Sequence, residues 1–367
     1  MNILILCYQG DVAGSTYSIH VLAKGLAEKG HQVYLGCRPE SLLYRLIQGS
    51  KVIPLPMPFR NKADFKTIWL IRKAVQQYKI DVINPQASRD RYLTALSQWI
   101  FGFRPVVVHT RRQRPRSDGG KLQSWFYMKV TDRIVAVSQS VKNQLIGIGI
   151  KEEHIKVIYN GTPSEKYKRM DAGKTEAYRK QYQLKENDIV IGCVARPKRQ
   201  QQLLKALAHI PFPVKVLFVG LPKTAEWQSI EKQYNKIHTV YYTGIISPED
   251  ALNYYPLFTI KVLPSISEGL SQALLEAMAI GIPVVATAAS GNLDLVKDGV
   301  NGYLYPNDDG AALAELIIHL IEHPELRKQF IEAGKKTALE DFSLDKTIRN
   351  YELFFEELLH QKQLKKT

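Results

Sequence analysis

Residues 263–305 read LPSISEGLSQALLEAMAIGIPVVATAASGNLDLVKDGVNGYLY, and these residues indicate most directly which fold the chain adopts. Apolar residues recur at intervals of three and four positions across residues 270–278, which predicts an amphipathic helix. Gly281 and Pro283 mark its end. The apolar run at 284–286 is typical of a strand that is buried on both faces. The whole stretch therefore reads as strand, loop, helix, strand, loop, short helix and strand.

The polar residues in front of this helix form a candidate ligand site. Ser265, Ser267, Glu268 and Gly269 stand where unpaired backbone N–H groups and the helix dipole favour a phosphate. Gly269 has no Cβ, so a ligand can approach the backbone closely there. Glu276 lies off the apolar stripe, on a flank that can face a cleft. The alternative is that the first four residues only cap the helix and that Glu276 is a solvated surface residue.

The order of these residues resembles the donor-binding signature of the family-4 retaining glycosyltransferases, which have the GT-B fold. Members of that family carry a Glu, seven residues, a second Glu, a Gly-x-Pro-Val-Val-Ala strand and an Asp-Gly-x-x-Gly segment. One departure is visible, because Ser290-Gly291 and Asp294 stand where the family has Gly-Gly and then Glu. The residues that match are Glu268, Glu276, residues 281–286 and residues 298–302.

Composition places the chain among globular enzymes. Its 367 residues favour about two domains, with 45% hydrophobic and 23% charged residues. Cys7, Cys37 and Cys193 lie far apart, which argues against a disulfide framework or a zinc site and fits a reducing cytosol. The N-terminal residues lack the features of a signal peptide, and no apolar run is long enough to span a bilayer. A net charge of +15 favours anionic partners: nucleic acid, phosphorylated sugars or an acidic membrane surface.

The N-terminal residues predict a βαβ unit. Strand 3–7, a glycine-bearing loop at 9–15, helix 18–28 and strand 33–36 place that loop at the ligand edge of a parallel sheet. A plain tight turn is the alternative. In the family a glycine loop and the helix after it close over the donor diphosphate. The resemblance therefore implies that Gly14 binds the donor, with Ala13-Gly14 in place of the usual Gly-Gly.

His109 ends a predicted buried strand, 106–109, that points to the same edge. A single histidine is more often structural than catalytic. The family places a His near the transferring sugar here, so the resemblance implies a catalytic role. Residues 157–162 then resemble the family's Ile-x-Asn-Gly-x-Asp segment, with Thr162-Pro163 as a departure.

A basic run follows this strand and precedes an aromatic helix with Trp125, Phe126 and Met128. Such a run is often a solvated loop, but it can also dock an anionic acceptor or lipid headgroups. Both interpretations stay open. The arginines of the run are Arg111, Arg112, Arg114 and Arg116.

A second alternation of strands and helices follows, with strands at 189–194, 214–220, 240–244 and 257–263. We therefore predict an α/β protein of GT-B fold, with two Rossmann-like domains that face each other across a cleft. The last segment is amphipathic, and the resemblance implies that it packs back on the first domain. The predicted parts are an acceptor domain at 1–163, a linker at 164–187, a donor domain at 188–343 and the C-terminal helix within 344–367.

A second basic segment follows the strand at 189–194, again at the ligand edge. In the family an Arg after this strand and a Lys a few residues later neutralise the donor diphosphate. Arg196 matches the first, and Lys198 is our choice for the second, with Arg199 as the reserve because the family's spacer is longer. An ordinary basic loop is the alternative.

The remaining roles also come from the resemblance. Glu268 would hold sugar hydroxyls and Glu276 the ribose diol. Backbone amides of Gly269, Leu270 and Ser271 would bind the diphosphate, and backbone near Ile245 the base.

The predicted reaction is transfer of a sugar from a nucleotide-sugar, UDP-linked by preference, to a hydroxyl of a growing bacterial surface glycan such as lipopolysaccharide, with retention. No Asp-x-Asp metal motif is present, so we expect neither a metal nor another cofactor. The expected partners are the donor, a glycan or lipid-linked acceptor and an anionic membrane surface, with no nucleic acid. The expected location is the cytoplasm or the inner face of the plasma membrane. Two alternatives are a nucleotide-sugar epimerase or hydrolase of the same fold and a basic nucleic-acid-binding protein.

Overall fold

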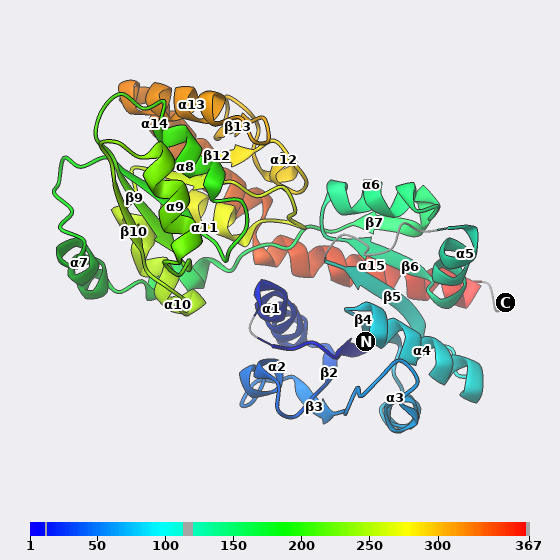
Figure 1. Ribbon diagram of the computed structural model, residues 1–367. Helices are drawn as coiled ribbons and strands as arrows, with labels where there is room; N and C mark the ends of the chain where they lie inside the picture. Colours follow the sequence, from blue (N-terminus) through cyan, green and yellow to red (C-terminus); the bar gives the residue numbers. More distant parts are fainter. Residues whose placement is uncertain (12, 113–119, 365–367) are drawn as a thin grey trace. The chain divides into compact units, whose positions relative to one another are not determined.

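The structure, a computed structural model, describes residues 1–11, 13–112 and 120–364. The chain forms two compact units. The first consists of Met1–Gly161 with Leu344–Thr367, and the second of Thr162–Ser343. Each unit is built on one parallel β-sheet with helices on both faces, which confirms the predicted α/β class (Figure 1).

The first unit contains a seven-stranded sheet in the order β3-β2-β1-β4-β5-β6-β7. All its strand pairs are parallel, so the carboxyl ends of the strands meet at one edge. The central strands are apolar on both faces because helices cover both. The strands are β1 Asn2–Cys7, β2 Gln32–Cys37, β3 Ile53–Pro56, β4 Val82–Pro85, β5 Val106–Arg111, β6 Arg133–Ala136 and β7 Ile155–Val157.

Alternate residues of these strands face two different helix layers. On one face, α1, α2 and α15 pack over Ile3, Ile5 and Val108. On the other, α3 and α4 pack over Leu4 and Val107, while α5 and α6 cover β6. The helices of this unit are α1 Gly14–Glu28, α2 Leu42–Leu46, α3 Phe65–Gln77, α4 Ser88–Phe101, α5 Lys121–Val130, α6 Gln139–Gly147, η1 Glu152–His154 and α15 Leu344–Leu364.

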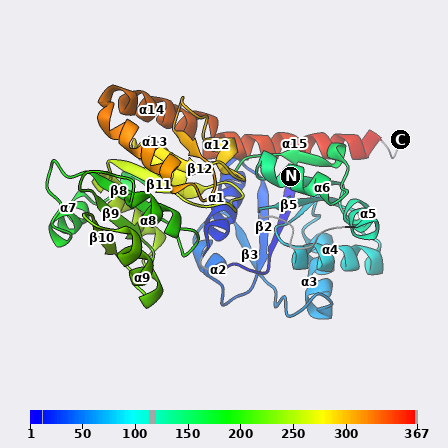
Figure 2. The ribbon, with the colours of Figure 1, turned by 45° about the horizontal axis from the view of Figure 1, so that its top comes forward.

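The C-terminal helix α15 belongs to the first unit, as the amphipathic pattern and the resemblance predicted (Figures 1 and 2). Its Tyr351 and Phe355 are fully buried, and the Tyr351 hydroxyl lies 3.2 Å from Thr110 Oγ1 of β5. Helix α1 approaches it closely, because a Cβ on Gly25 would lie 2.0 Å from Ile348 Cδ1. A side chain at position 25 would therefore force Ile348 to move.

The second unit contains a six-stranded parallel sheet in the order β10-β9-β8-β11-β12-β13. Helices α8, α9 and α13 cover the face that presents Ile191, Val216 and Val262. The strands are β8 Val190–Val194, β9 Lys215–Val219, β10 Thr239–Tyr242, β11 Ile260–Leu263, β12 Val284–Thr287 and β13 Tyr303–Tyr305. The helices are η2 Ser164–Arg169, α7 Ala172–Gln181, α8 Gln201–Leu207, α9 Ala225–Tyr234, α10 Pro248–Ala251, η3 Leu252–Leu257, α11 Gln272–Ile280, α12 Asn292–Leu295, α13 Gly310–Glu322, α14 Pro324–Lys336 and the π-helical η4 Thr337–Asp341.

The segment predicted as a linker, 164–187, is instead a folded part of the second unit. It holds η2 and α7, and Tyr178 of α7 stacks on Tyr254 with ring centroids 4.1 Å apart. Tyr182 and Leu184 are also buried. Burial of these apolar surfaces fixes the segment, which its Lys- and Glu-rich composition did not reveal.

Strand β11 carries a fully buried lysine. Lys261 is 0% exposed and pairs with Gly192 of β8. Because its neighbours Ile260 and Val262 face the α8–α9–α13 layer, Lys261 points to the opposite face. Its ammonium donates to the carbonyls of Val262 at 3.1 Å and Val194 at 3.4 Å. Burial lowers the pKa of Lys261 from 10.5 to about 8, because a low dielectric disfavours the charged form.

Replacing Lys261 with Met should stabilise the protein at pH 7, because Met occupies similar space without a buried charge. The pKa difference sets the scale at roughly 3 kcal/mol, since one pKa unit corresponds to about 1.4 kcal/mol. The folded-state pKa lies below the unfolded value, so the wild type gains stability relative to the variant as pH rises from about 8 to 10.5. Urea unfolding of both proteins across this range tests the prediction, and a difference independent of pH would contradict it.

Candidate active site

The loop between β11 and α11 leaves the carboxyl edge of the second sheet, where ligands of parallel sheets bind. Ser271 is the N-cap of α11, and its Oγ accepts a hydrogen bond from Leu274 N at 3.3 Å. Leu270 is buried at 8% exposure and anchors the loop to the core. The backbone around Gly269, Leu270 and Ser271 therefore stands at the positive end of a nine-residue helix.

A second loop, after β12, holds this first loop in place. Asn292 Nδ2 donates to Ser265 O at 2.9 Å, and Ser290 Oγ donates to Ile266 O at 2.7 Å. Ser290 adopts φ of +49°, in the left-handed region that favours glycine. The hydrogen bond to Ile266 O explains how a serine occupies this position, where the family pattern has a glycine.

Gly291 makes the closest contact between the two loops. Its N–H donates to Glu268 O at 3.2 Å, and a Cβ at this position would lie 2.1 Å from Gly269 O. Any side chain at 291 would therefore displace the backbone that carries Glu268 and Gly269.

The structure brings together two of the predicted site residues, Lys198 and Glu268. Lys198 Nζ donates to Glu268 Oε1, and the side chains are 31% and 15% exposed. Gln200 shapes the lysine's loop after β8, since its amide accepts from Lys198 N at 2.6 Å and donates to Arg196 O at 2.8 Å. Arg196 is exposed in the same loop. Of the two candidates for the family lysine, Lys198 is thus the one that contacts Glu268, while Arg199 is half-buried.

The second predicted carboxylate, Glu276, is more buried than its place off the apolar stripe suggested. Its side chain is 12% exposed. One oxygen accepts from the hydroxyl of Tyr255 in η3 at 2.8 Å, and the other from Lys166 Nζ of η2. Burial, followed by the nearby Glu276, raises the pKa of Tyr255 well above its usual value, which keeps the phenol protonated as a donor.

Lys166 and Tyr255 are site residues that the sequence analysis missed. Lys166 lies in the segment taken as a linker, and Tyr255 lies in the segment expected to lead into a strand. No spacing rule connects either residue to Glu276, so only the fold reveals these contacts.

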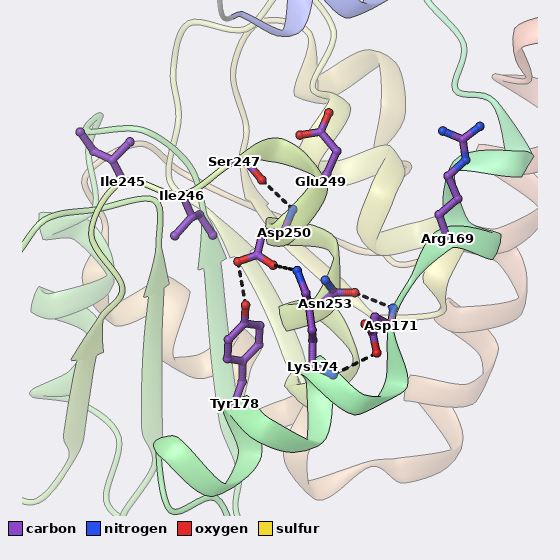
Figure 3. Close-up of a pocket in the computed structure, with 10 residues that line it drawn as sticks. All are labelled: Arg169, Asp171, Lys174, Tyr178, Ile245, Ile246, Ser247, Glu249, Asp250 and Asn253. Carbon is purple, nitrogen blue, oxygen red and sulfur yellow. Dashed lines mark hydrogen bonds and ion pairs between the residues drawn. The ribbon is translucent and has the colours of Figure 1, made fainter.

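A cavity of about 580 Å³ opens in the second unit between η2, α7 and α10 (Figure 3). Ile245, the residue expected near the base, lines it and is 89% exposed. Asp250 accepts from Tyr178 OH at 2.7 Å and from Lys174 Nζ at 2.9 Å, which ties α7 to α10. Arg169 of η2 also lines this cavity. The cavity is thus polar, with one exposed apolar side chain.

The predicted site residues of the first unit lie in different environments. Gly14 is exposed as the first residue of α1. His109 is 0% exposed, lies 6.3 Å from the Tyr127 ring between centroids and donates from Nδ1 to Pro85 O at 3.0 Å. Burial and then Arg91 and Arg111 lower the pKa of His109 well below its usual value. The imidazole is therefore neutral and enclosed in this structure, and its expected catalytic role stays a prediction.

The basic run after β5 is only partly a surface feature. Arg112 is 8% exposed, and its guanidinium donates to Gln86 Oε1 at 3.0 Å and to Asn160 Oδ1 at 2.8 Å. These bonds hold the guanidinium inside the first unit, so Arg112 is not exposed to a membrane surface, and its expected contact with the acceptor stays a prediction. Arg111 is half-buried and donates to Ser88 Oγ at 3.0 Å. Arg114 and Arg116 lie outside the described residues.

Across residues 1–11, 13–112 and 120–364, no three or more His, Cys, Asp or Glu side chains gather as they would around a metal ion. Among the helices of that same part of the chain, none has the length and apolar character needed to cross a bilayer.

Comparison with known proteins gives family matches over both units. The model of "Glycosyltransferase Family 4" matches residues 12–166, and that of "Glycosyl transferases group 1" matches residues 174–337. Three curated relatives are all named uncharacterized glycosyltransferases of Methanocaldococcus jannaschii. The chain covers 60% of the length of each of them.

Longer matches are also found. The chain is 24% identical to N-acetyl-alpha-D-glucosaminyl L-malate synthase of Bacillus anthracis, over 98% of this chain and 97% of that one. It is 25% identical to the capsular polysaccharide biosynthesis glycosyltransferase CapM of Staphylococcus aureus, over 80% of each.

The fold matches solved structures over nearly the whole chain. The crystal structure of Anabaena HepE in complex with UDP-glucose superimposes with a TM-score of 0.80, at 20% identity, covering 98% of this chain and 100% of that one. At this identity the likeness concerns the fold alone. With two parallel-sheet units and family matches that run from residue 12 to residue 337, the chain belongs to the family-4 glycosyltransferases of GT-B fold.

Proposed function

We propose that this glycosyltransferase moves a sugar from a nucleotide-sugar, UDP-linked by preference, to a hydroxyl of a growing bacterial surface glycan, with retention and without a metal ion. The observation that carries the proposal is the contact of Lys198 with Glu268 beside the N-terminus of α11. It combines a cation for a leaving diphosphate with a carboxylate for sugar hydroxyls. The UDP-glucose of HepE and the capsular role named for CapM support the donor and acceptor classes.

The leaving diphosphate is the main charge that such a site must stabilise. Lys198 and Arg196 follow β8, while the amides at Gly269 to Ser271 follow the adjacent β11. Cations and backbone N–H groups set in advance stabilise developing negative charge without reorganisation during the reaction. Arg199 in the same loop is the reserve for this role. These groups supply the stabilisation in a mechanism that needs no metal.

Glu268 has a partner before any donor binds. Its ion pair with Lys198 holds the carboxylate in one place at 15% exposure. When a diphosphate takes the lysine's charge, the carboxylate becomes free to accept hydrogen bonds from sugar hydroxyls. Such bonds to a charged acceptor are stronger than neutral ones.

Glu276 is proposed to bind the ribose in the same way. Lys166 occupies one of its oxygens and Tyr255 the other, so the diol replaces the lysine while the phenol keeps the carboxylate oriented. The base would then lie against the backbone at Ile245, on the side of the cavity shown in Figure 3.

Replacing Glu276 with Ala should weaken binding of UDP by roughly 1.5–3 kcal/mol, the range for hydrogen bonds to a charged group. Titration calorimetry with free UDP measures this. Replacing exposed Glu226 of α9 with Ala removes the same charge elsewhere and should leave the affinity unchanged. Equal affinity of the Glu276→Ala variant and the wild type would remove Glu276 from the site.

The single variants Lys198→Ala and Arg196→Ala should each have turnover lowered by about 10²-fold or more, because each loses one preorganised group that stabilises charge. Arg199→Ala, in the same loop, tests the reserve residue and should be nearly silent if Lys198 has this role. Turnover is measured as sugar incorporated into acceptor and as free sugar released. If Lys198→Ala is silent and Arg199→Ala is inactive, Arg199 rather than Lys198 has the diphosphate-binding role. Free sugar as the main product would favour a hydrolase.

A chelator should leave wild-type turnover unchanged, because protein groups carry the diphosphate charge in this proposal. The assay is the same, with EDTA added before the donor and the nucleotide supplied as a metal-free salt. Loss of activity that returns with added Mg²⁺ or Mn²⁺ would refute the metal-independent mechanism.

A further inference from the structure

Three of the chain's four tryptophans are exposed, and all three belong to successive helices of the first unit. Trp69 of α3, Trp99 of α4 and Trp125 of α5 are 49%, 83% and 56% exposed, whereas Trp227 of the second unit is 8% exposed. Tryptophan is usually well buried in a soluble fold. A concentration of exposed rings on one helix layer therefore indicates a surface that is covered in use.

The three helices form one continuous layer. They pack on the same face of the sheet, and α4 lies between α3 and α5 in both views (Figures 1 and 2). Ser97 of α4 donates to Ile68 O of α3 at 2.8 Å, and Tyr92 of α4 stacks on Phe126 of α5 at 5.3 Å between centroids. We call their outer side the α3–α4–α5 face. Its exposed apolar side chains are Phe65, Trp69, Trp99, Ile100, Leu122 and Trp125.

The charge on this face has one sign. The sequences of α3, α4 and α5 contain a single acidic residue, Asp90, which is 0% exposed and accepts from Tyr8 N and Ala87 N. The N-cap of α3, Asp64, is 6% exposed. No carboxylate of these helices therefore reaches the surface. The exposed cations are Lys66, Lys73, Lys121 and Lys129.

Lysines lie over aromatic rings of α3 and α4. Lys73 Nζ is 5.6 Å from the Trp69 ring centroid, and Lys62 Nζ is 5.3 Å from that of Tyr92. A lysine in this position covers apolar surface with its methylenes and keeps its ammonium at the level of polar headgroups. Indole rings favour the same interfacial depth, where one side is apolar and the other wet.

Three partners could cover such a face: another protein, a single-stranded nucleic acid or a lipid surface. The observed features favour the lipid surface. The core of a protein interface is depleted of lysine, whereas α3 and α5 each carry two exposed lysines together with exposed apolar side chains of this face. A single-stranded nucleic acid needs a basic groove that follows its backbone, but these side chains project from the outer sides of three helices. Ile100 and Leu122 also offer no stacking surface to a base. A lipid surface can contact both kinds of side chain on this face. The apolar side chains insert between headgroups, and the lysines attract anionic lipids.

We propose that the α3–α4–α5 face docks the protein onto a bilayer that carries anionic headgroups. This surface differs from the arginine run after β5, of which Arg112 is bonded inward. Docking needs neither donor nor acceptor, so it stands independently of the proposed reaction.

Vesicle flotation with the full chain tests the proposal, using phosphatidylcholine vesicles with and without phosphatidylglycerol. The wild type should bind mainly the anionic vesicles. A variant with Trp69, Trp99 and Trp125 all replaced by Ser should bind at least about tenfold more weakly, because its apolar contacts are lost. Replacing Lys66, Lys73, Lys121 and Lys129 by Gln should cost about fivefold per lysine, and high salt should have the same effect.

Matched controls separate this face from general charge. One replaces four exposed lysines elsewhere, Lys51, Lys232, Lys236 and Lys328, by Gln and should retain most of the vesicle binding. Melting temperatures of all variants should match the wild type, because every replaced side chain is exposed. Wild-type tryptophan emission should shift to the blue on anionic vesicles and be quenched by brominated lipid.

Any of the following results would overturn the proposal. The first is equal vesicle binding by the wild type and the tryptophan variant. The second is an equal loss in the control lysine variant, since charge alone would then explain binding. The third is a concentration-dependent dimer in sedimentation that the tryptophan variant abolishes, or tight binding of a single-stranded oligonucleotide without binding of vesicles. Either finding would assign the face to another partner.

Discussion

The contact of Gly291 with the Gly269 carbonyl is the constraint on which the candidate active site depends. A Cβ at position 291 would lie 2.1 Å from that oxygen, so the loops after β11 and β12 can approach only through glycine. Side chains of Ser290 and Asn292 then close the remaining hydrogen bonds between the loops. This approach fixes the backbone that carries Glu268 and opens α11. The absence of a side chain at Gly291 thus allows the backbone position that Glu268 needs.

Around this backbone, both carboxylates of the site are paired with lysines. Lys198 reaches Glu268 from the loop after β8, and Lys166 reaches Glu276 from η2. Carboxylates this little exposed would be costly to bury alone, so each partner offsets the loss of hydration. In the reaction proposed above, the same cations would bind the donor's phosphates, and the carboxylates would then accept hydrogen bonds from hydroxyls.

In the first unit, two residues with polar side chains that the sequence placed in functional roles are buried. His109 and Arg112 follow one another closely at the end of β5, yet both are enclosed by neighbouring elements. His109 faces the layer of α4 and α5, whereas the Arg112 guanidinium is held by Gln86 and Asn160. Meanwhile the exposed residues of that helix layer are aromatic and basic. The outer side of these helices thus carries exposed apolar and basic side chains, whereas Arg112 at the start of the loop after β5 is enclosed.

The fold class, a helix across residues 270–278 that stops at Gly281, and the likeness of residues 263–305 to the donor signature could all be predicted from the sequence. The helix is observed as α11, Gln272–Ile280. These predictions rest on local features, because periodicity, glycine stops and capping residues act within a few positions of each other. The sequence also indicated that the C-terminal segment is amphipathic, which the packing of α15 confirms.

Which charged groups meet depends on contacts that form only in the folded chain. Lys198 and Glu268 are 70 positions apart, and Lys166 and Glu276 are 110 apart. The first pair forms because β8 and β11 are neighbours in the sheet, an order that no local pattern encodes. The burial of Lys261, His109 and Arg112 was equally hidden, since enclosure depends on elements that arrive from distant parts of the chain. Residue type and spacing therefore predict which segment carries a site. Sheet order and helix packing decide which side chains from other segments join it.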